Sequence, residues 1–380
     1  MLGVVHGVTP LELLFDLVFV LAFTQVTRVL LDDPTWGGLG QALLILAALW
    51  WAWAAYAWLT NTVDPDEGVV LAAMLVAMAA MFVTALAFPT AFGDHGVLFG
   101  VAFLVVNVMH RALFALAARG DPDLLGAILR TSPATFIGCA LILAAGFVDG
   151  GLKDVLWVGA LAVGFLGPLF SDLTGWRVEP SHFIERHGLI MIIAIGESLI
   201  AIGFAATNIG LDTGVIVAAV LGLVVTTSFW LAYFDFFPLR ARQLLADRSG
   251  AERTALARDI YTYLHLPMVA GIVLFAFAME MTIAHVHDEL DTIPAFGLCV
   301  GPAVYLLSFV ALRFRVSRTL GRGRLIAAAA CTLLWPLALV VPALVALALV
   351  AAVWVVFHAY EIIWWRDARA ETRAHRHPAR

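Results

Sequence analysis

Long runs of apolar residues constrain this chain more than any other feature of its sequence. The runs are about 20 residues long, which is the length that a helix needs to cross ~30 Å of hydrocarbon. A segment surrounded by lipid must satisfy its own backbone hydrogen bonds, so runs of this kind form α-helices. Charged residues make up only 13% of the chain and gather between the runs. The sequence therefore predicts an all-α, polytopic integral membrane protein.

The apolar runs predict about twelve membrane-spanning helices. Residues 325–363 form one apolar stretch, in which Pro336 and Pro342 favour a break between two spans over one kinked span. The connecting segments are too short for a separate soluble domain. The predicted spans cover residues 11–31, 37–60, 68–88, 96–118, 133–149, 154–172, 187–207, 213–235, 262–283, 294–313, 325–341 and 343–363.

The positions of Lys and Arg predict the orientation of these spans, because cytoplasmic loops carry an excess of both. With a cytoplasmic N-terminus, all 22 basic residues except Arg28 and Lys153 fall on the cytoplasmic side. Eleven spans would instead place the arginine-rich C-terminal tail outside. We therefore expect both termini in the cytoplasm. Arg111, at a predicted cytoplasmic helix end, is interpreted as snorkelling to the membrane interface.

A short repeated pattern divides the chain into two candidate halves. The pattern Trp-x-Ala-Tyr occurs at residues 53–56 and 230–233, at equivalent places in a division of six plus six helices. Many transporters are built from parallel repeats of this kind. The predicted parts are a first six-helix half at residues 1–172, a second half at 173–365 and a basic cytoplasmic tail at 366–380.

Residue usage excludes several classes of protein. A phosphate-binding loop needs a lysine after glycine, and a retinal protein needs a lysine in mid-membrane. The single lysine, Lys153, precedes Asp154 in a short loop. ATP-driven transport by this chain alone and light-driven pumping are therefore excluded. The basic residues are scattered over several loops, which disfavours a nucleic-acid partner, and the pattern predicts no cofactor and no metal site.

Two carboxylates share one face of the first predicted span. Glu12 and Asp16 stand four residues apart, which places them on the same side of a helix. Ionisable groups inside spans are costly and face a partner or a wet cavity. In one interpretation the pair binds a cation or shares a proton. In the other, it pairs with arginines for assembly.

The second candidate segment begins with three ionisable residues at 185–187. Glu197 follows His187 by ten residues, about 15 Å along a helix, which places it near the bilayer centre. A buried carboxylate at that depth lies on an ion path or takes part in a hydrogen bond between helices. Gly196 permits close approach of a neighbouring backbone or local unwinding. The predicted binding residues are Glu12, Asp16, Glu185, Arg186, His187, Glu197 and Ser198.

Two separate segments resemble the hallmark segments of the bacterial low temperature requirement A family. One runs from Pro10 to Gln25 and the other from Glu185 to Ser198, and the similarity extends through most of the chain. The resemblance implies a multi-pass protein of the bacterial cytoplasmic membrane, tied by name to growth in the cold. It implies no established activity and no catalytic residues.

Three functional hypotheses follow from these patterns. The leading one is a secondary transporter or an ion pathway for a small solute or cation, with Glu12, Asp16 and Glu197 lining a polar route. The second is an intramembrane enzyme acting on a lipid or isoprenoid, with a head-group site formed by residues 185–187 and the nearby Asp172 and His182. The third is a structural or accessory protein. Membrane lipids and a second copy of the chain are the other expected partners.

Overall fold

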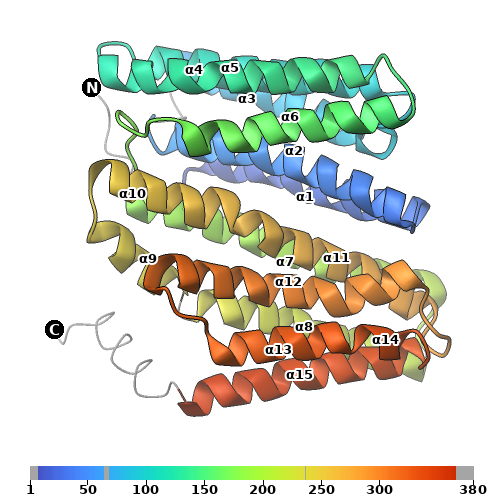
Figure 1. Cartoon of the computed structure of the whole chain (residues 1–380). Helices are drawn as coiled ribbons and strands as arrows, with labels where there is room; N and C mark the ends of the chain where they lie inside the picture. Colours follow the sequence, from blue (N-terminus) through green and yellow to red (C-terminus); the bar gives the residue numbers. More distant parts are fainter. Residues whose placement is uncertain (1–6, 64–67, 236, 365–380) are drawn as a thin grey trace. The chain divides into compact units, whose positions relative to one another are not determined.

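Helices account for almost all of the structure. The computed structural model describes residues 7–63, 68–235 and 237–364 (Figure 1). Within these residues no strand is found, and an isolated antiparallel bridge joins Glu289 to Pro342. The fold class that the apolar runs predict, an all-α polytopic membrane protein, is confirmed. The predicted basic tail, residues 366–380, lies outside the described residues.

The chain forms two compact units. The first contains residues 1–193 and 244–262, and the second contains residues 194–243 and 263–380. These limits are not those of the predicted halves, and the internal repeat remains a prediction. The first unit holds α1 (Pro10–Asp32), α2 (Trp36–Thr60), α3 (Gly68–Leu86), η1 (Phe88–Thr90), α4 (Gly96–Ala117), α5 (Pro122–Ala145), α6 (Gly151–Phe170), the first part of α7 (Pro180–Ile209) and α10 (Gly250–Ala257).

The second unit holds the rest of α7 and the C-terminal helices. Its helices are α8 (Thr213–Phe234), α11 (His265–Ala284), α12 (Thr292–Ser317), α13 (Arg322–Leu333), α14 (Trp335–Ala338) and α15 (Ala343–Trp364). The helix α9 (Phe237–Ala246) and the short π-helix η2 (Arg258–Tyr263) each cross a limit between the units. Because α7 is one unbroken helix, it belongs to both units.

Eleven helical stretches in the described part of the chain are long and apolar enough to cross a membrane. The difference from twelve lies at the predicted span 325–341. Pro336 lacks a backbone N–H and interrupts this region, so that α13 has 12 residues and the short α14 follows. In Figure 1, α13 and α14 run one after the other beside α12 and α15. The broken pair thus occupies the place of the predicted eleventh span, and α15 corresponds to the twelfth.

Local hydrogen bonds determine where α1 and α7 begin. At α1, the Thr9 side chain accepts from the backbone N–H of Glu12 at 3.3 Å, and the Glu12 carboxylate accepts from the N–H of Thr9 at 2.9 Å. This reciprocal capping box satisfies two donors at the helix start. At α7, Glu179 Oε2 accepts from the N–H of His182 at 2.6 Å. Glu12 and His182 consequently occupy the first turn of their helices.

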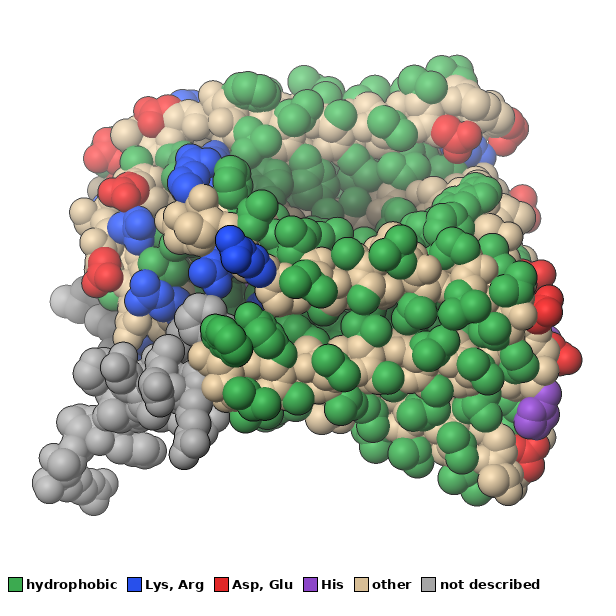
Figure 2. Space-filling view, turned by 60° about the horizontal axis from the view of Figure 1, so that its bottom comes forward, with side chains coloured by type: hydrophobic (Ala, Val, Ile, Leu, Met, Phe, Trp, Pro, Cys, Tyr) green, Lys and Arg blue, Asp and Glu red, His purple; other side chains and the backbone are tan. Residues whose placement is uncertain are grey.

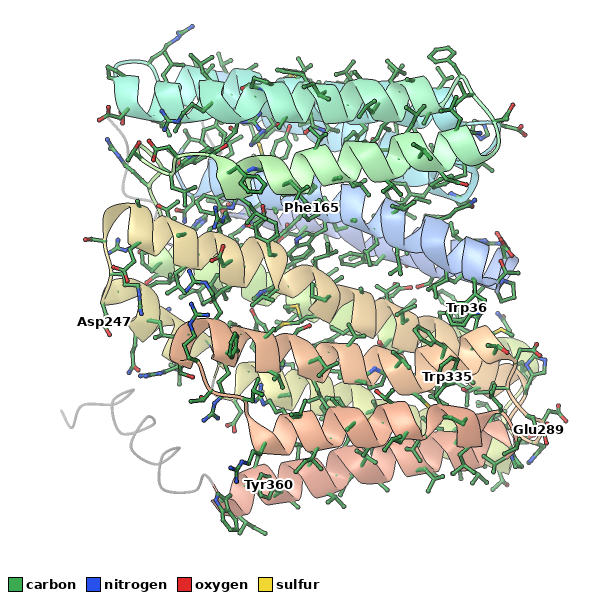
Figure 3. All side chains as sticks on the ribbon, in the orientation of Figure 1. Trp36, Phe165, Asp247, Glu289, Trp335 and Tyr360 are labelled. Atoms are coloured by element: carbon green, nitrogen blue, oxygen red, sulfur yellow. The ribbon has the colours of Figure 1, made fainter. Side chains whose placement is uncertain are left out.

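Apolar side chains cover the sides of the helices, and charged side chains gather at the helix ends (Figure 2). Val69 is 72% exposed on α3 and Ile326 is 68% exposed on α13, as lipid-facing residues are in a protein of this class. Trp36 begins α2, and Tyr360 lies in the last turns of α15 (Figure 3). Aromatic residues at helix ends are typical of the membrane–water interface.

Glycines allow close contact between neighbouring helices inside each unit. A Cβ atom at Gly100 of α4 would lie 2.7 Å from Cα of Leu143 on α5. In the second unit, a Cβ atom at Gly271 of α11 would lie 2.5 Å from the carbonyl oxygen of Gly301 on α12. Real Cβ atoms do not fit at such distances, so these glycines set the separation of the helices.

Candidate functional site

Four buried ionisable side chains of α1 and α7 form a cluster inside the first unit. Glu12 and Asp16 are four residues apart on α1, and His182 and Arg186 are four residues apart on α7. His182 Nε2 lies 3.1 Å from Glu12 Oε2, and Arg186 Nη1 donates to Asp16 Oδ2 at 2.9 Å. None of the four residues is more than 1% exposed. We call this set of four residues the α1–α7 cluster.

Arg186 binds both carboxylate residues. Its Nη1 also donates to the backbone oxygen of Glu12 at 3.0 Å, and its Nε lies 3.4 Å from Glu12 Oε1. Its guanidinium carbon lies 5.8 Å from the centre of the Trp53 ring. Nη2 is buried and has no hydrogen-bond partner among the described residues. Part of the guanidinium is therefore left for a water molecule or a transient partner, since buried donors are rarely unpaired.

Asn61 determines which nitrogen of His182 carries the proton. Glu179 fixes the Asn61 amide, because its backbone N–H donates to Asn61 Oδ1 at 2.7 Å and its carbonyl accepts from Asn61 Nδ2 at 3.0 Å. Asn61 Nδ2 then faces His182 Nδ1 at 3.3 Å as a donor. Nδ1 must accept, so Nε2 carries the proton and donates to Glu12. In this arrangement His182 is neutral.

The α1–α7 cluster carries unequal numbers of positive and negative groups. With neutral His182, two carboxylates face one guanidinium, for a formal charge of −1. Both α1 and α7 begin at the cluster, and the partial positive charge of a helix N-terminus stabilises nearby anions. The backbone thus offsets the excess charge, and one added proton would bring the side chains to neutrality.

Three of the four carboxylate oxygens in the cluster accept hydrogen bonds from protein donors, and the fourth lies beside a guanidinium nitrogen. Asp16 Oδ1 accepts from Trp53 Nε1 at 2.9 Å, and Asp16 Oδ2 accepts from Arg186. Glu12 Oε2 accepts from Thr9 and His182, while Arg186 Nε lies beside Glu12 Oε1. The cluster is thus suited to exchanging a proton, whereas a metal cation would have to displace several of these donors.

His187 lies beside the cluster in an aromatic environment. Its ring centre is 4.9 Å from Trp53, 4.5 Å from Phe183 and 4.7 Å from Tyr261. Its Nδ1 donates to the carbonyl oxygen of Phe183 at 2.8 Å. Trp53 therefore contacts both His187 and Asp16, and it connects the predicted residues of the two hallmark segments.

Glu185 lies outside the cluster although it directly precedes Arg186. Its side chain is exposed, because successive residues of a helix point about 100° apart. Asp172 is exposed as well, and it accepts hydrogen bonds from the backbone N–H and the hydroxyl of Thr174. The structure therefore does not gather residues 185–187 and Asp172 into one head-group site.

Glu197 and Ser198 lie in the part of α7 that belongs to the second unit. Both are buried, at 2% and 0% exposure. The helix continues unbroken through Gly196, and a Cβ atom there would meet no described atom within 4 Å. Neither the unwinding nor the close backbone contact expected at Gly196 is found. Of the predicted residues, the structure brings together Glu12, Asp16 and Arg186, with His187 adjacent.

The sequence did not predict Asn61 and Trp53 as binding residues, and it placed His182 only in the head-group site of the enzyme hypothesis. A signal for His182 was present, because His182 and Arg186 repeat the four-residue spacing of Glu12 and Asp16. Two helix faces with the same spacing, one of carboxylates and one of nitrogen donors, can pair residue by residue. Asn61 and Trp53 gave no such signal, since polar and aromatic residues are common at the ends and interiors of membrane helices.

Comparison with known proteins places the chain in a family. Residues 7–359 match the family described as bacterial low temperature requirement A protein (LtrA). An uncharacterized protein of Rhizobium meliloti (strain 1021) is 32% identical over 321 residues, which are 81% of this chain and 78% of the relative. No solved structure matches the chain. The match covers both segments that carry the α1–α7 cluster.

Proposed function

Since this chain belongs to the bacterial low temperature requirement A family of multi-pass membrane proteins, we propose that it is a proton-coupled secondary transporter. The α1–α7 cluster is its proton-binding centre. The same proposal places the chain in the bacterial cytoplasmic membrane with both termini in the cytoplasm, as its arginine positions predict.

The observation that carries the proposal is the complete burial of two carboxylates beside one guanidinium. Glu12, Asp16 and Arg186 are each 0% exposed. Buried ionisable groups in membrane spans are costly and mark ion or proton paths. In a low-dielectric site a single proton changes the interaction energy of neighbouring charges far more than it does in water. Protonation here therefore has large structural consequences.

Asp16 is the residue at which the proton acts. A proton on Asp16 Oδ2 removes the negative charge that faces Arg186 Nη1, so the contact at 2.9 Å loses the attraction between two opposite charges. Arg186 stays bound to Glu12 through the backbone oxygen and the carboxylate. The contact between α1 and α7 is thereby weakened at Asp16 and kept at Glu12.

Weakening the contact between Asp16 and Arg186 allows α7 to shift along α1. The helix continues without a break from Arg186 to Glu197 and Ser198. A displacement of its first part is therefore passed to a buried carboxylate in the second unit. Helix displacement controlled by the protonation of one carboxylate is a physical basis for alternating access.

The test is proton flux in proteoliposomes that contain a pH-sensitive dye and carry an imposed potential. We expect the wild-type protein to move protons and the Asp16→Asn protein to lose that flux, because asparagine keeps the acceptor for Trp53 but cannot be protonated. Glu185→Gln is the matched control on α7, and it should keep the flux since Glu185 is exposed. Size-exclusion profiles of all three proteins establish that they fold.

Equal flux in the folded Asp16→Asn and wild-type proteins would refute the proposal. A second function would then be favoured, in which the same ion pairs serve to dock α7 on α1. Its supporting observation is that Glu12 belongs both to the capping box of α1 and to the contact with Arg186. That role predicts a less stable protein with unaltered flux.

A further inference from the structure

Three groups of the α1–α7 cluster can take up a proton: the carboxylates of Glu12 and Asp16 and the ring of His182. Helix α2 supplies a neutral hydrogen-bond donor to two of them. Trp53 Nε1 donates to Asp16 Oδ1 at 2.9 Å, and Asn61 Nδ2 faces His182 Nδ1 at 3.3 Å. The two contacts are chemically similar, but they have opposite consequences for the uptake of a proton.

Asp16 can take up a proton without meeting the hydrogen of another donor. Each carboxylate oxygen has two lone pairs. Oδ1 uses one of them toward Trp53 Nε1, and Oδ2 uses one toward Arg186 Nη1. A proton can therefore bind at a remaining lone pair, and the carboxylic acid that results still accepts hydrogen bonds.

His182 has no lone pair to spare. Its Nδ1 has a single lone pair, which faces Asn61 Nδ2 as the acceptor. A charged histidine ring carries a hydrogen on both nitrogens. A proton on Nδ1 would thus point at an N–H group of Asn61. Either the ring stays neutral, or the Asn61 amide has to turn over and present its oxygen.

Glu179 holds the Asn61 amide in its present orientation. The backbone N–H of Glu179 donates to Asn61 Oδ1 at 2.7 Å, and its carbonyl oxygen accepts from Asn61 Nδ2 at 3.0 Å. Turning the amide over would place N–H against N–H and oxygen against oxygen, so both hydrogen bonds would be lost. Asn61 is only 8% exposed, so solvent gives little compensation. A proton on His182 therefore requires several contacts to break together.

Charged side chains of the described residues that lie near His182 belong to α1, α10 and the start of α7. Glu12 of α1 lies 3.1 Å from Nε2, and Arg186, four residues after His182 on α7, binds the same glutamate. Glu179 contacts the backbone N–H of His182 and not its ring. From α10, Arg253 Nη1 lies 3.5 Å from a carbonyl oxygen of the loop before α7. These charges oppose one another, and the contact at Nδ1 is the one that an added proton must break.

We propose that Asn61 keeps the proton away from His182 and leaves the two carboxylates as the proton acceptors of the α1–α7 cluster. Asn61 is a positioning residue, because it acts through the His182 ring and never carries the proton. The consequence for transport rests on the proposed function. A proton on His182 would cancel the excess negative charge of the cluster but would leave the ion pair of Asp16 and Arg186 in place, so α7 would not be released.

The position of the proton is measured by NMR of the purified full chain in lipid nanodiscs, with isotope-labelled histidine. The ring nitrogens have different chemical shifts in each neutral tautomer and in the charged ring, and the His182 signal is the one that disappears in His182→Gln. A neutral sample at about pH 7.5 and an acidic sample at about pH 6 both lie in the range where histidine charge usually changes. In the wild-type protein we expect a neutral ring with its proton on Nε2 in both samples.

Two variants remove the constraint in different ways. Asn61→Ala removes the donor, and the isosteric Asn61→Asp places a carboxylate oxygen beside Nδ1, where it can accept from a charged ring. In the acidic sample the ratio of charged to neutral His182 should rise about tenfold in Asn61→Ala, as for one lost hydrogen bond, and further in Asn61→Asp. Asn107→Ala is the matched control, since Asn107 is also buried but donates to the carbonyl oxygen of Phe103 on its own helix. Its His182 signal should equal that of the wild type.

Proton flux in proteoliposomes gives a second measurement, which separates positioning from folding. In both Asn61 variants the flux should be about tenfold lower under the acidic condition than under the neutral one, because a charged ring repels a further proton from the cluster. Wild type and Asn107→Ala should not show this fall. It should also disappear in the double variant Asn61→Ala with His182→Gln, which has no ring to protonate, whereas a merely structural defect would persist there.

Three results would overturn the inference. These are a charged ring or a proton on Nδ1 in wild-type His182, an unchanged His182 signal in both folded Asn61 variants, and an acidic fall in flux that persists in the double variant. If Asn61→Ala does not fold, Asn61→Asp decides, and if neither folds, the wild-type spectra decide. The absence of any wild-type flux would count against the proposed function alone, because the spectra report the role of Asn61 without it.

Discussion

Replacing Arg186 with glutamine removes the cation that contacts Glu12 and Asp16 together. Both carboxylates then stay buried at 0% exposure without their counter-charge. Breaking a buried ion pair by removing one partner costs about 3–5 kcal/mol, because the remaining charge is uncompensated. Asp16→Asn is milder, since the amide oxygen still accepts from Trp53 Nε1. It should cost about 1.5–3 kcal/mol, the usual contribution of a charge-assisted hydrogen bond.

Thermal unfolding in detergent, followed with a thiol-reactive dye, measures these differences. The three cysteines, Cys139, Cys299 and Cys331, are all buried, so the dye reacts as the protein unfolds. We expect the unfolding temperature to fall most for Arg186→Gln and less for Asp16→Asn. The double variant should be less destabilised than the sum of the two, because its residues share one contact.

Arg248→Gln is the matched control for Arg186→Gln. Arg248 pairs with Glu252 at 3.0 Å, but the Glu252 side chain is 74% exposed. An exposed pair of this kind contributes about 0–1 kcal/mol. If Arg186→Gln and Arg248→Gln unfold at the same temperature, or if the double variant shows full additivity, the α1–α7 cluster does not hold the first unit together and the reasoning fails.

Two further predictions concern other parts of the chain. Gly271→Ala should destabilise the second unit by about 1–3 kcal/mol, because its Cβ atom would lie 2.5 Å from the Gly301 carbonyl oxygen, whereas Gly40→Ala, with open space around it, should be neutral or stabilising in the same unfolding assay. Hydrogen bonds from the hydroxyl and the N–H of Thr174 lower the pKa of Asp172. The loop stability that they provide is therefore complete above the ordinary pKa of Asp172 and is lost as pH falls through the lowered value. Hydrogen exchange at the Thr174 amide should accelerate over that acidic range. In Asp172→Asn this acceleration should be absent, because the side chain at position 172 no longer takes up a proton.

The sequence was sufficient for the class of fold and for most of the helices. Each span is encoded locally, by about 20 apolar residues and by caps such as Thr9 and Glu179. The break at Pro336 was also visible, because proline removes a helical hydrogen bond wherever it occurs. The pattern nevertheless counted residues 325–341 as one spanning helix, whereas α13 ends at Leu333.

The partners of the charged residues could not be derived in the same way. Glu12 and Arg186 are 174 positions apart in the chain, and their contact depends on how α1 and α7 pack. The sequence identified both segments as functional candidates, but it assigned Glu185 and Arg186 to one site. Helix geometry separates these two neighbours, because one faces the bundle and the other faces outward.

Arg111 and Arg186 show what this dependence on packing means for function. In the sequence both are arginines beside a histidine, near a predicted cytoplasmic helix end. In the fold, Arg186 meets two carboxylates of its own chain, whereas Arg111 meets two threonine hydroxyls. A guanidinium with internal carboxylates responds to their protonation, so it suits a proton-controlled contact. A guanidinium whose hydrogen bonds go to neutral hydroxyls has no carboxylate partner whose protonation could break them. The same residue type therefore stands in two different electrostatic settings within one unit, and the partner supplied by the neighbouring helix decides between them.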